Sequence, residues 1–216
     1  MTQAPATTRI LFVGNSYTSR NNLPRLVADL AATASFPREV QFDAIVAGGA
    51  SLKRHWNAGR VHAALASARW DYVVLQEQST LPFKNPLRYH ESVRLFHPEI
   101  VRNGAKSALY LTWSRRQTPE RQAEITRAVK DIATETGALV VPVGLAWHRV
   151  LQQAPGTELY VDDGSHPSVA GSYLAACVFL VALFGQYPGG WTVADALKID
   201  RPTAERLHAA ASEALP

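Results

Sequence analysis

The chain has 216 residues, of which 47% are hydrophobic and 19% are charged, a balance that suits one domain with a sizeable buried core. Its formal net charge is +4 and its basic residues are scattered, so it lacks the basic stripe of a nucleic-acid-binding protein. The longest apolar run, Leu174 to Phe184, is too short to span a bilayer, and the first residues lack the pattern of a secretory signal. We therefore expect a single cytoplasmic domain over residues 1–216, with a flexible N-terminus over 1–8.

Strand and helix patterns alternate along the chain. Short β-branched and aromatic runs that end at a turn residue are typical of buried strands. They predict strands at Arg9–Gly14, Val40–Val46, Tyr72–Leu75, Ser107–Thr112 and Leu139–Val143. Apolar residues at helical spacing predict helices over 22–36, 52–68, 90–103, 119–137, 146–152, 169–184 and 203–214. This alternation indicates βαβ units, and we predict an α/β fold, a three-layer αβα sandwich with a five-stranded, mainly parallel sheet.

Three segments suited to ligand binding directly follow the first three predicted strands: Gly14–Ser16, Gly48–Gly49 and Gln76–Gln78. Ligands bind at the carboxyl ends of the strands in open sheets of this kind, so we expect these segments to share one edge. A serine at a strand-to-helix turn suits a nucleophile that must later support an oxyanion. Glycine lets the backbone approach a ligand closely, and the two glutamines supply amide donors.

A fourth segment, Asp163-Gly164-Ser165-His166, lies beyond the last predicted strand. A carboxylate three residues before a histidine can accept a hydrogen bond from the imidazole. That bond fixes the tautomer and leaves the other ring nitrogen free to take a proton from serine. Serine needs such a base because its hydroxyl is a weak nucleophile at neutral pH.

These segments resemble the sequence blocks of the SGNH (GDSL-like) serine hydrolases. Ile10–Thr18 (ILFVGNSYT) resembles the first block, usually written GDS, with Asn15 where aspartate is commoner. Ala47–Ser51 (AGGAS) resembles the glycine block and Asp163–Ser168 (DGSHPS) the DxxH block, and all appear in the family's order. Tyr72–Ser79 (YVVLQEQS) looks similar to an atypical bacterial branch of the superfamily.

The resemblance implies a flavodoxin-like fold and an acyl-enzyme mechanism. Ser16 would attack the ester, His166 would act as base and then as acid, and Asp163 would orient His166. The backbone N–H groups of Ser16 and Gly48 would form part of the oxyanion hole. Nothing in the sequence calls for a cofactor or a metal, because the other histidines show no ligand spacing.

The third block departs from the family pattern, because QEQ stands where GxND is usual. No asparagine is present there to act as the side-chain oxyanion donor. Gln76 and Gln78 share a face if the strand extends through them. We favour Gln78, which lies beyond the strand end, and keep Gln76 as the alternative. Loss of one oxyanion donor typically costs about 10²–10³ in rate.

Several of these residues also have a purely structural interpretation. Ser16 on its own could be a helix N-cap, and the Asp–His segment on its own could be a loop turn with a surface histidine. Glu77 is expected to pair with a cation or to lie at the rim. Trp113 and Trp147 could line an acyl or sugar pocket, or pack in the core.

The function we expect is hydrolysis of a carboxylic ester, with a short acyl group such as acetyl on a polar or carbohydrate alcohol. One alternative is a non-catalytic ligand-binding domain on the same fold, which the missing asparagine motivates. Another is an acyltransferase that uses the same Ser, His and Asp and differs in how it excludes water. The expected partner is an ester substrate, with no nucleic acid and no membrane span.

Overall fold

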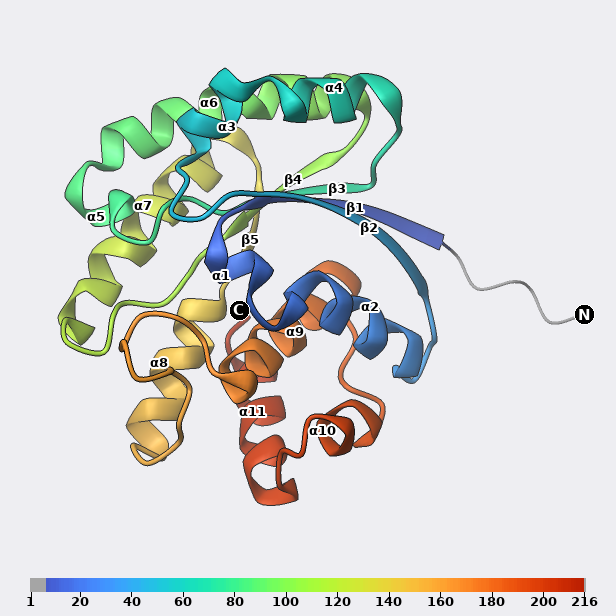
Figure 1. The fold of residues 1–216 in the computed structure, drawn as a ribbon, viewed down its shortest axis with the longest axis vertical. Helices are drawn as coiled ribbons and strands as arrows, with labels where there is room; N and C mark the ends of the chain where they lie inside the picture. Colours follow the sequence, from blue (N-terminus) through green and yellow to red (C-terminus); the bar gives the residue numbers. More distant parts are fainter. Residues whose placement is uncertain (1–6, 216) are drawn as a thin grey trace, which may run out of the picture.

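The computed structural model describes residues 7–215, which form a five-stranded sheet with helices on both faces (Figure 1). The strands are β1 (Thr7–Gly14), β2 (Glu39–Val46), β3 (Tyr72–Leu75), β4 (Lys106–Tyr110) and β5 (Leu139–Val141). All four strand pairs are parallel, in the order β2-β1-β3-β4-β5. This is the flavodoxin-like order, and the predicted three-layer α/β sandwich is confirmed.

Each face of the sheet has its own hydrophobic core. Side chains alternate along a strand, so Ile10 and Phe12 of β1 belong to one core and Leu11 and Val13 to the other. The first core is covered by α2 (Leu23–Thr33), α8 (Val143–Gln153), α9 (Val169–Phe184), α10 (Thr192–Ala196) and α11 (Arg201–Glu213). The second is covered by α3 (Leu52–Ala58), α4 (Arg60–Ser67), α5 (Leu81–Lys84), α6 (Pro86–Asn103) and α7 (Gln122–Thr136).

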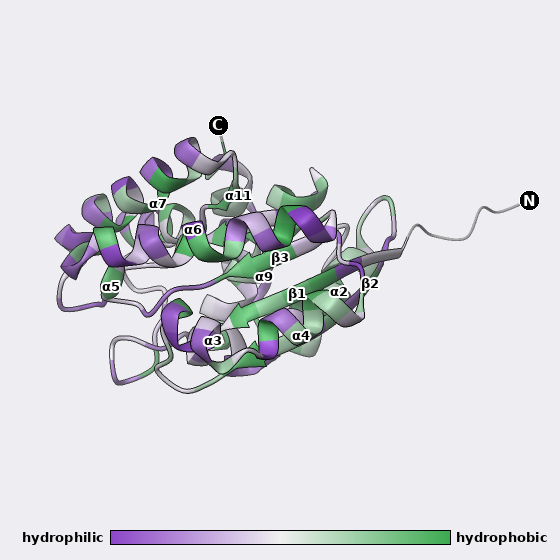
Figure 2. Cartoon of the chain, turned by 90° about the horizontal axis from the view of Figure 1, so that it is seen from above, coloured by the Kyte–Doolittle hydropathy of each residue, from purple (hydrophilic) through white to green (hydrophobic). Residues whose placement is uncertain are grey.

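Helix α9 lies at the centre of the first face and has the bounds predicted from the sequence. It packs against α2, α8 and α11, and nearly all of its side chains, including that of Cys177, are buried. A helix that is apolar on all sides is stable only when surrounded by other elements. Helices α6 and α7 on the other face differ from it, since both carry hydrophilic and hydrophobic residues (Figure 2). No helix within residues 7–215 is long and apolar enough to cross a membrane.

The structure differs from the predicted elements at several ends. The helix predicted over 52–68 is two helices, because Gly59 adopts a left-handed conformation (φ 72°) between α3 and α4. Helix α6 begins at Pro86, earlier than predicted, because the side chain of Asn85 caps it by accepting a hydrogen bond from the N–H of Arg88. Residues 1–6 of the expected flexible N-terminus lie outside the described residues, whereas 7–8 already belong to β1.

The connections set the position of a ligand site. From β1 the chain adds β2 on one side and then returns to add β3 on the other. Such a reversal opens a crevice at the carboxyl ends of the two strands on either side. Here those ends are Gly14 of β1, which leads into the short helix α1 (Ser16–Ser19), and Leu75 of β3.

Candidate active site

Ser16 lies at the sharp turn between β1 and α1. The N-cap of this helix is Asn15, whose side-chain oxygen accepts a hydrogen bond from the backbone N–H of Tyr17 at 3.1 Å. The hydroxyl of Ser16 is therefore not used for capping and can meet another partner. Gly14 is needed at the start of the turn, because a Cβ atom there would lie 2.5 Å from the side-chain oxygen of Gln76.

Ser16, His166 and Asp163 form a continuous chain of hydrogen bonds. Ser16 Oγ lies 2.8 Å from His166 Nε2, and His166 Nδ1 lies 2.6 Å from Asp163 Oδ2. Because a carboxylate can only accept, it favours the tautomer with a proton on Nδ1, which leaves Nε2 to accept from the serine hydroxyl. The hydrogen bond from the His166 ring, together with backbone N–H groups, lowers the pKa of Asp163 to about 2. The carboxyl group is therefore ionised at neutral pH.

The loop that carries Asp163 and His166 is closed by an isolated β-bridge between Tyr160 and Pro167. Asp163 Oδ1 accepts the backbone N–H groups two and three residues later, at 2.8 and 2.9 Å. Gly164 between them has a left-handed conformation, with φ at +65°. Asp163 therefore has both roles considered from the sequence. Its Oδ1 stabilises the loop turn, and its Oδ2 accepts the hydrogen bond from the imidazole.

A stack of three aromatic rings lies beside this loop. The ring of Trp113 stacks between those of Tyr17 and Trp147. The distances between ring centroids are 4.7 Å to Tyr17 and 3.9 Å to Trp147, and the interplanar angles are 6° and 9°. Trp113 Nε1 donates to the carbonyl of Ser165 at 3.0 Å, and the Tyr17 hydroxyl bonds the Ser165 hydroxyl at 2.7 Å. All three rings are buried. The structure therefore gives both tryptophans the core-packing role, in which they support the loop of His166.

The Gly48 segment lies next to the turn of Ser16. β1 and β2 are in register up to their last residues, and the N–H of Ala47 donates to the carbonyl of Gly14 at 3.2 Å. Asn15 Nδ2 then donates to the carbonyl of Ala50 at 3.0 Å. Within residues 7–215, the backbone N–H groups of Ser16 and Gly48 have no hydrogen-bond partner, so both can donate to a ligand.

The two glutamines after β3 have different surroundings. Gln76 has no exposed surface, and its Oε1 accepts from the N–H of Asn15 at 2.8 Å and the hydroxyl of Thr18 at 2.9 Å. Its Nε2 donates to the backbone of Glu77, so its amide holds the turn of Ser16 in place. Gln78 is half-buried and uses only Oε1, which accepts from Thr80 and the turn after it. Its Nε2 makes no bond within the described chain.

Two groups at this edge have surroundings that the sequence did not predict. His55 is 4% exposed, and its Nε2 donates to the carbonyl of Gly14 at 2.8 Å; burial lowers its pKa. Glu77 is 3% exposed and makes no ion pair within residues 7–215. It therefore has no cation partner there, and it lies, buried, at the rim of the sheet just after β3. His55 belongs to no sequence motif and Glu77 stands between the two glutamines of QEQ, so only the packing of the fold reveals that both are buried.

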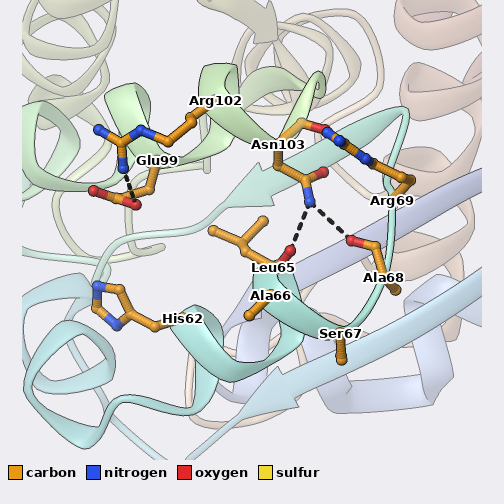
Figure 3. A pocket seen from close by; sticks show the side chains of 9 residues that line it. All are labelled: His62, Leu65, Ala66, Ser67, Ala68, Arg69, Glu99, Arg102 and Asn103. Atoms are coloured by element: carbon orange, nitrogen blue, oxygen red, sulfur yellow. Dashed lines mark hydrogen bonds and ion pairs between the residues drawn. The ribbon is translucent and has the colours of Figure 1, made fainter.

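A hollow at the opposite, amino edge of the sheet is lined by α4 and α6 (Figure 3). Asn103 Nδ2 donates to the carbonyls of Leu65 and Ala68 at 2.7 and 2.8 Å, and Asn103 Oδ1 accepts the N–H of Trp70 at 3.2 Å. The guanidinium of Arg69 bonds the Asn103 carbonyl. These polar groups hold the loops before β3 and β4 together.

Comparisons with known proteins agree with this architecture. No protein-family model and no curated protein matches the chain. A protein from Slackia heliotrinireducens assigned to the SGNH hydrolases is 33% identical, with a TM-score of 0.70, over 82% of this chain and 99% of its own. A DUF4886 family protein from Bacteroides uniformis is 22% identical over 96% of this chain and 94% of its own, with a TM-score of 0.71. The acetylxylan esterase Axe2 from Geobacillus stearothermophilus is 21% identical over 83% and 95%, with a TM-score of 0.67.

The fold and the site thus define an α/β protein of the flavodoxin-like type, with a hydrogen-bonded Ser, His and Asp at the carboxyl edge of its sheet. The sequence identity with the Slackia protein, and the share of both chains that it covers, also assign the chain to a family. The chain belongs to the SGNH hydrolases. The likeness to the Bacteroides and Geobacillus proteins is a likeness of fold.

Proposed function

We propose that this protein is a serine esterase that hydrolyses carboxylic esters through an acyl-enzyme. The observation that carries the proposal is the pair of distances in the Ser16–His166–Asp163 chain, 2.8 and 2.6 Å. Both lie within the range at which a base can take the proton of its nucleophile. Membership of the SGNH hydrolases supports the same reaction class.

In the first half of the reaction, Ser16 Oγ attacks the ester carbonyl carbon while its proton passes to His166 Nε2. Asp163 stabilises the imidazolium through Nδ1. As the tetrahedral intermediate collapses, His166 returns the proton to the leaving alcohol, and the acyl group stays on Ser16. In the second half, His166 takes a proton from water, the hydroxide adds to the acyl carbon, and Ser16 leaves with the proton.

The negative charge on the former carbonyl oxygen requires preorganised donors. We assign them to the backbone N–H groups of Ser16 and Gly48 and to Gln78 Nε2. The support is that all three are without a partner in residues 7–215, whereas the amide of Gln76 is bonded on both sides. Gln78 would then take the place that asparagine has in the usual third block.

For the substrate, we propose a short acyl group, such as acetyl, on a polar or carbohydrate alcohol. The side chains of His166 and Asp163 are 29% and 46% exposed, so the site is open enough for a large polar alcohol. An acetylxylan esterase shares the fold. The same exposure favours hydrolysis over acyl transfer, because transfer requires that water be kept from the acyl-enzyme.

The test is turnover of p-nitrophenyl acetate, butyrate and octanoate by the parent and by Ser16→Ala. We expect the parent to prefer acetate and Ser16→Ala to lose at least about 10⁴-fold in kcat. Ser19→Ala is the matched control, since Ser19 is an exposed serine of the same short helix and its loss should leave kcat unchanged. Equal rates for Ser16→Ala and the parent would remove Ser16 as the nucleophile. A parent that binds esters but never cleaves them would favour the binding-domain alternative.

A further inference from the structure

Glu77 is a buried carboxyl group that makes no ion pair within residues 7–215. Its Oε1 accepts the backbone N–H of Leu52 at 3.1 Å and that of Gln78 at 2.6 Å. Its Oε2 is buried and has no hydrogen-bond partner within residues 7–215. Burial raises the pKa of Glu77 to about 7, against the opposing effect of these N–H groups and of Arg88. Such a group is costly to keep in a folded protein, which calls for a reason beyond packing.

The two N–H groups that Glu77 binds belong to two different segments of the proposed oxyanion hole. Leu52 is the first residue of α3 and follows the Gly48 turn. Gln78 is the proposed side-chain donor. One carboxylate oxygen therefore joins the two segments.

This contact completes a closed circuit of hydrogen bonds around the site. Asn15 Nδ2 joins the turn of Ser16 to the Gly48 segment through the carbonyl of Ala50. Glu77 joins that segment to the residues after β3. Gln76 Oε1 joins these residues back to the N–H of Asn15. The three loops that supply the proposed nucleophile and donors are therefore fixed relative to one another by three buried side chains.

The charges around Glu77 do not explain its presence. Arg88, the cation that acts on it, is exposed at the first turn of α6 and forms no ion pair with it within the described chain. Tyr89 on its other side is fully buried, and Glu77 raises the pKa of that phenol further. The residue is placed for its two backbone contacts.

We propose that Glu77 is a positioning residue that acts through Gln78 and the Gly48 segment, and so sets the geometry of the oxyanion hole; this rests on the proposed esterase function. Oxyanion donors must lie about 2.7–3.1 Å from the oxygen they stabilise, and a misplacement of about 1 Å can cost 10²-fold in rate. In this role Glu77 acts on the donors and not on the substrate itself. Its effect is therefore on kcat and not on substrate binding.

The first experiment measures kcat and KM for p-nitrophenyl acetate in Glu77 variants. Glu77→Ala should lower kcat by about 30- to 100-fold with KM changed by less than about threefold. Glu77→Gln should restore kcat to within about threefold of the parent, because the amide oxygen can accept the same two bonds. If Glu77→Ala does not fold, Glu77→Asp takes its place, since its shorter side chain cannot reach both N–H groups and should lower kcat in the same direction.

The second experiment asks whether Glu77 acts through Gln78. In a double-mutant cycle, removal of Glu77 should cost much less kcat in a Gln78→Ala background than in the parent. Asn103→Ala is the control, since it removes buried backbone contacts at the far edge of the sheet and should lower stability without changing kcat. An active parent whose Glu77 variants lose only stability, or whose two losses are additive, would overturn this role alone. A parent with no esterase activity would overturn the proposed function and this role with it.

Discussion

The two edges of the sheet carry similar polar groups, but these groups differ in whether they have hydrogen-bond partners. At the carboxyl edge, the N–H groups of Ser16 and Gly48 and the amide nitrogen of Gln78 have no partner within residues 7–215. At the amino edge, the hollow of Figure 3 also holds an amide, together with two guanidinium groups. There the side chain of Asn103 makes three hydrogen bonds to the backbone, and Arg69 a fourth contact with Asn103.

This difference distinguishes a candidate ligand-binding site from a purely structural contact between loops. Buried polar groups in native proteins almost always have a hydrogen-bond partner. In a structural contact, the donors and acceptors are therefore paired with one another. A site that must stabilise a transient charge has to keep donors free until that charge forms. The presence of polar residues in a hollow is therefore a weaker sign of function than the presence of unused donors.

Among the changes that test this comparison of the two edges, the largest effect should come from Asp163, the residue proposed to orient His166. Asp163→Asn should lower kcat by roughly 10³- to 10⁴-fold, because an amide at this position no longer favours the proton on His166 Nδ1. Since the pKa of Asp163 is about 2, the comparison made at neutral pH is between a full charge and none. The neighbouring exposed residue offers the control, and Asp162→Asn should hydrolyse p-nitrophenyl acetate at the parent rate. Equal losses of kcat in both variants would show that the negative charge of the loop matters, and not the hydrogen bond between Asp163 and His166.

A smaller effect should come from the free amide. Gln78→Glu keeps the oxygen that caps the next turn and replaces the free nitrogen with a second oxygen. We expect kcat to fall by about 10²–10³ while the urea midpoint of unfolding stays close to that of the parent. Gln153→Ala, at an exposed amide on α8, should change neither. An unchanged kcat in Gln78→Glu would overturn the proposed place of Gln78 in the oxyanion hole.

The smallest effect on catalysis should come from the amino edge. Asn103→Ala leaves two carbonyls and one N–H without their partner, which should lower the free energy of unfolding by about 2 kcal/mol. We expect kcat within about twofold of the parent at a temperature where both proteins are folded. Urea titration and steady-state kinetics on the same samples separate the two quantities. A loss of kcat that exceeds the loss of folded protein would mean that the two edges are coupled.

The fold could be predicted from the sequence because its periodic signals are strong. β3 and α9 have the predicted bounds at both ends, since an apolar run flanked by turn residues marks a buried element clearly. The short helices α1, α5 and α10 could not be predicted, because four or five residues are too few for a helical period. The break between α3 and α4 depends on one left-handed glycine, Gly59, and a single glycine inside a helical pattern has several outcomes.

The candidate site was predictable only as a set of segments. The rule that parallel strands present their carboxyl ends at one edge was enough to bring Ser16, Gly48 and the glutamines together. The sequence could not decide whether Gln76 or Gln78 has a free amide nitrogen. The directions of these side chains depend on hydrogen bonds to Asn15 and to Thr80. Those partners come from other parts of the fold or from a turn without periodicity. Glu77 stayed hidden for the same reason, since only packing shows that it is buried.

The hydrogen bond between Ser16 and His166 joins residues 150 positions apart. Contacts of this sequence separation form late, because the entropy of closing a long loop must be offset by other native contacts first. During synthesis, Ser16 and the strand before it leave the ribosome well before the loop that carries His166. The hydroxyl of Ser16 therefore does not have the His166 ring beside it until all five strands have been made. Esterase activity of a nascent or refolding chain would thus report the docking of its last third and not the formation of its first strand.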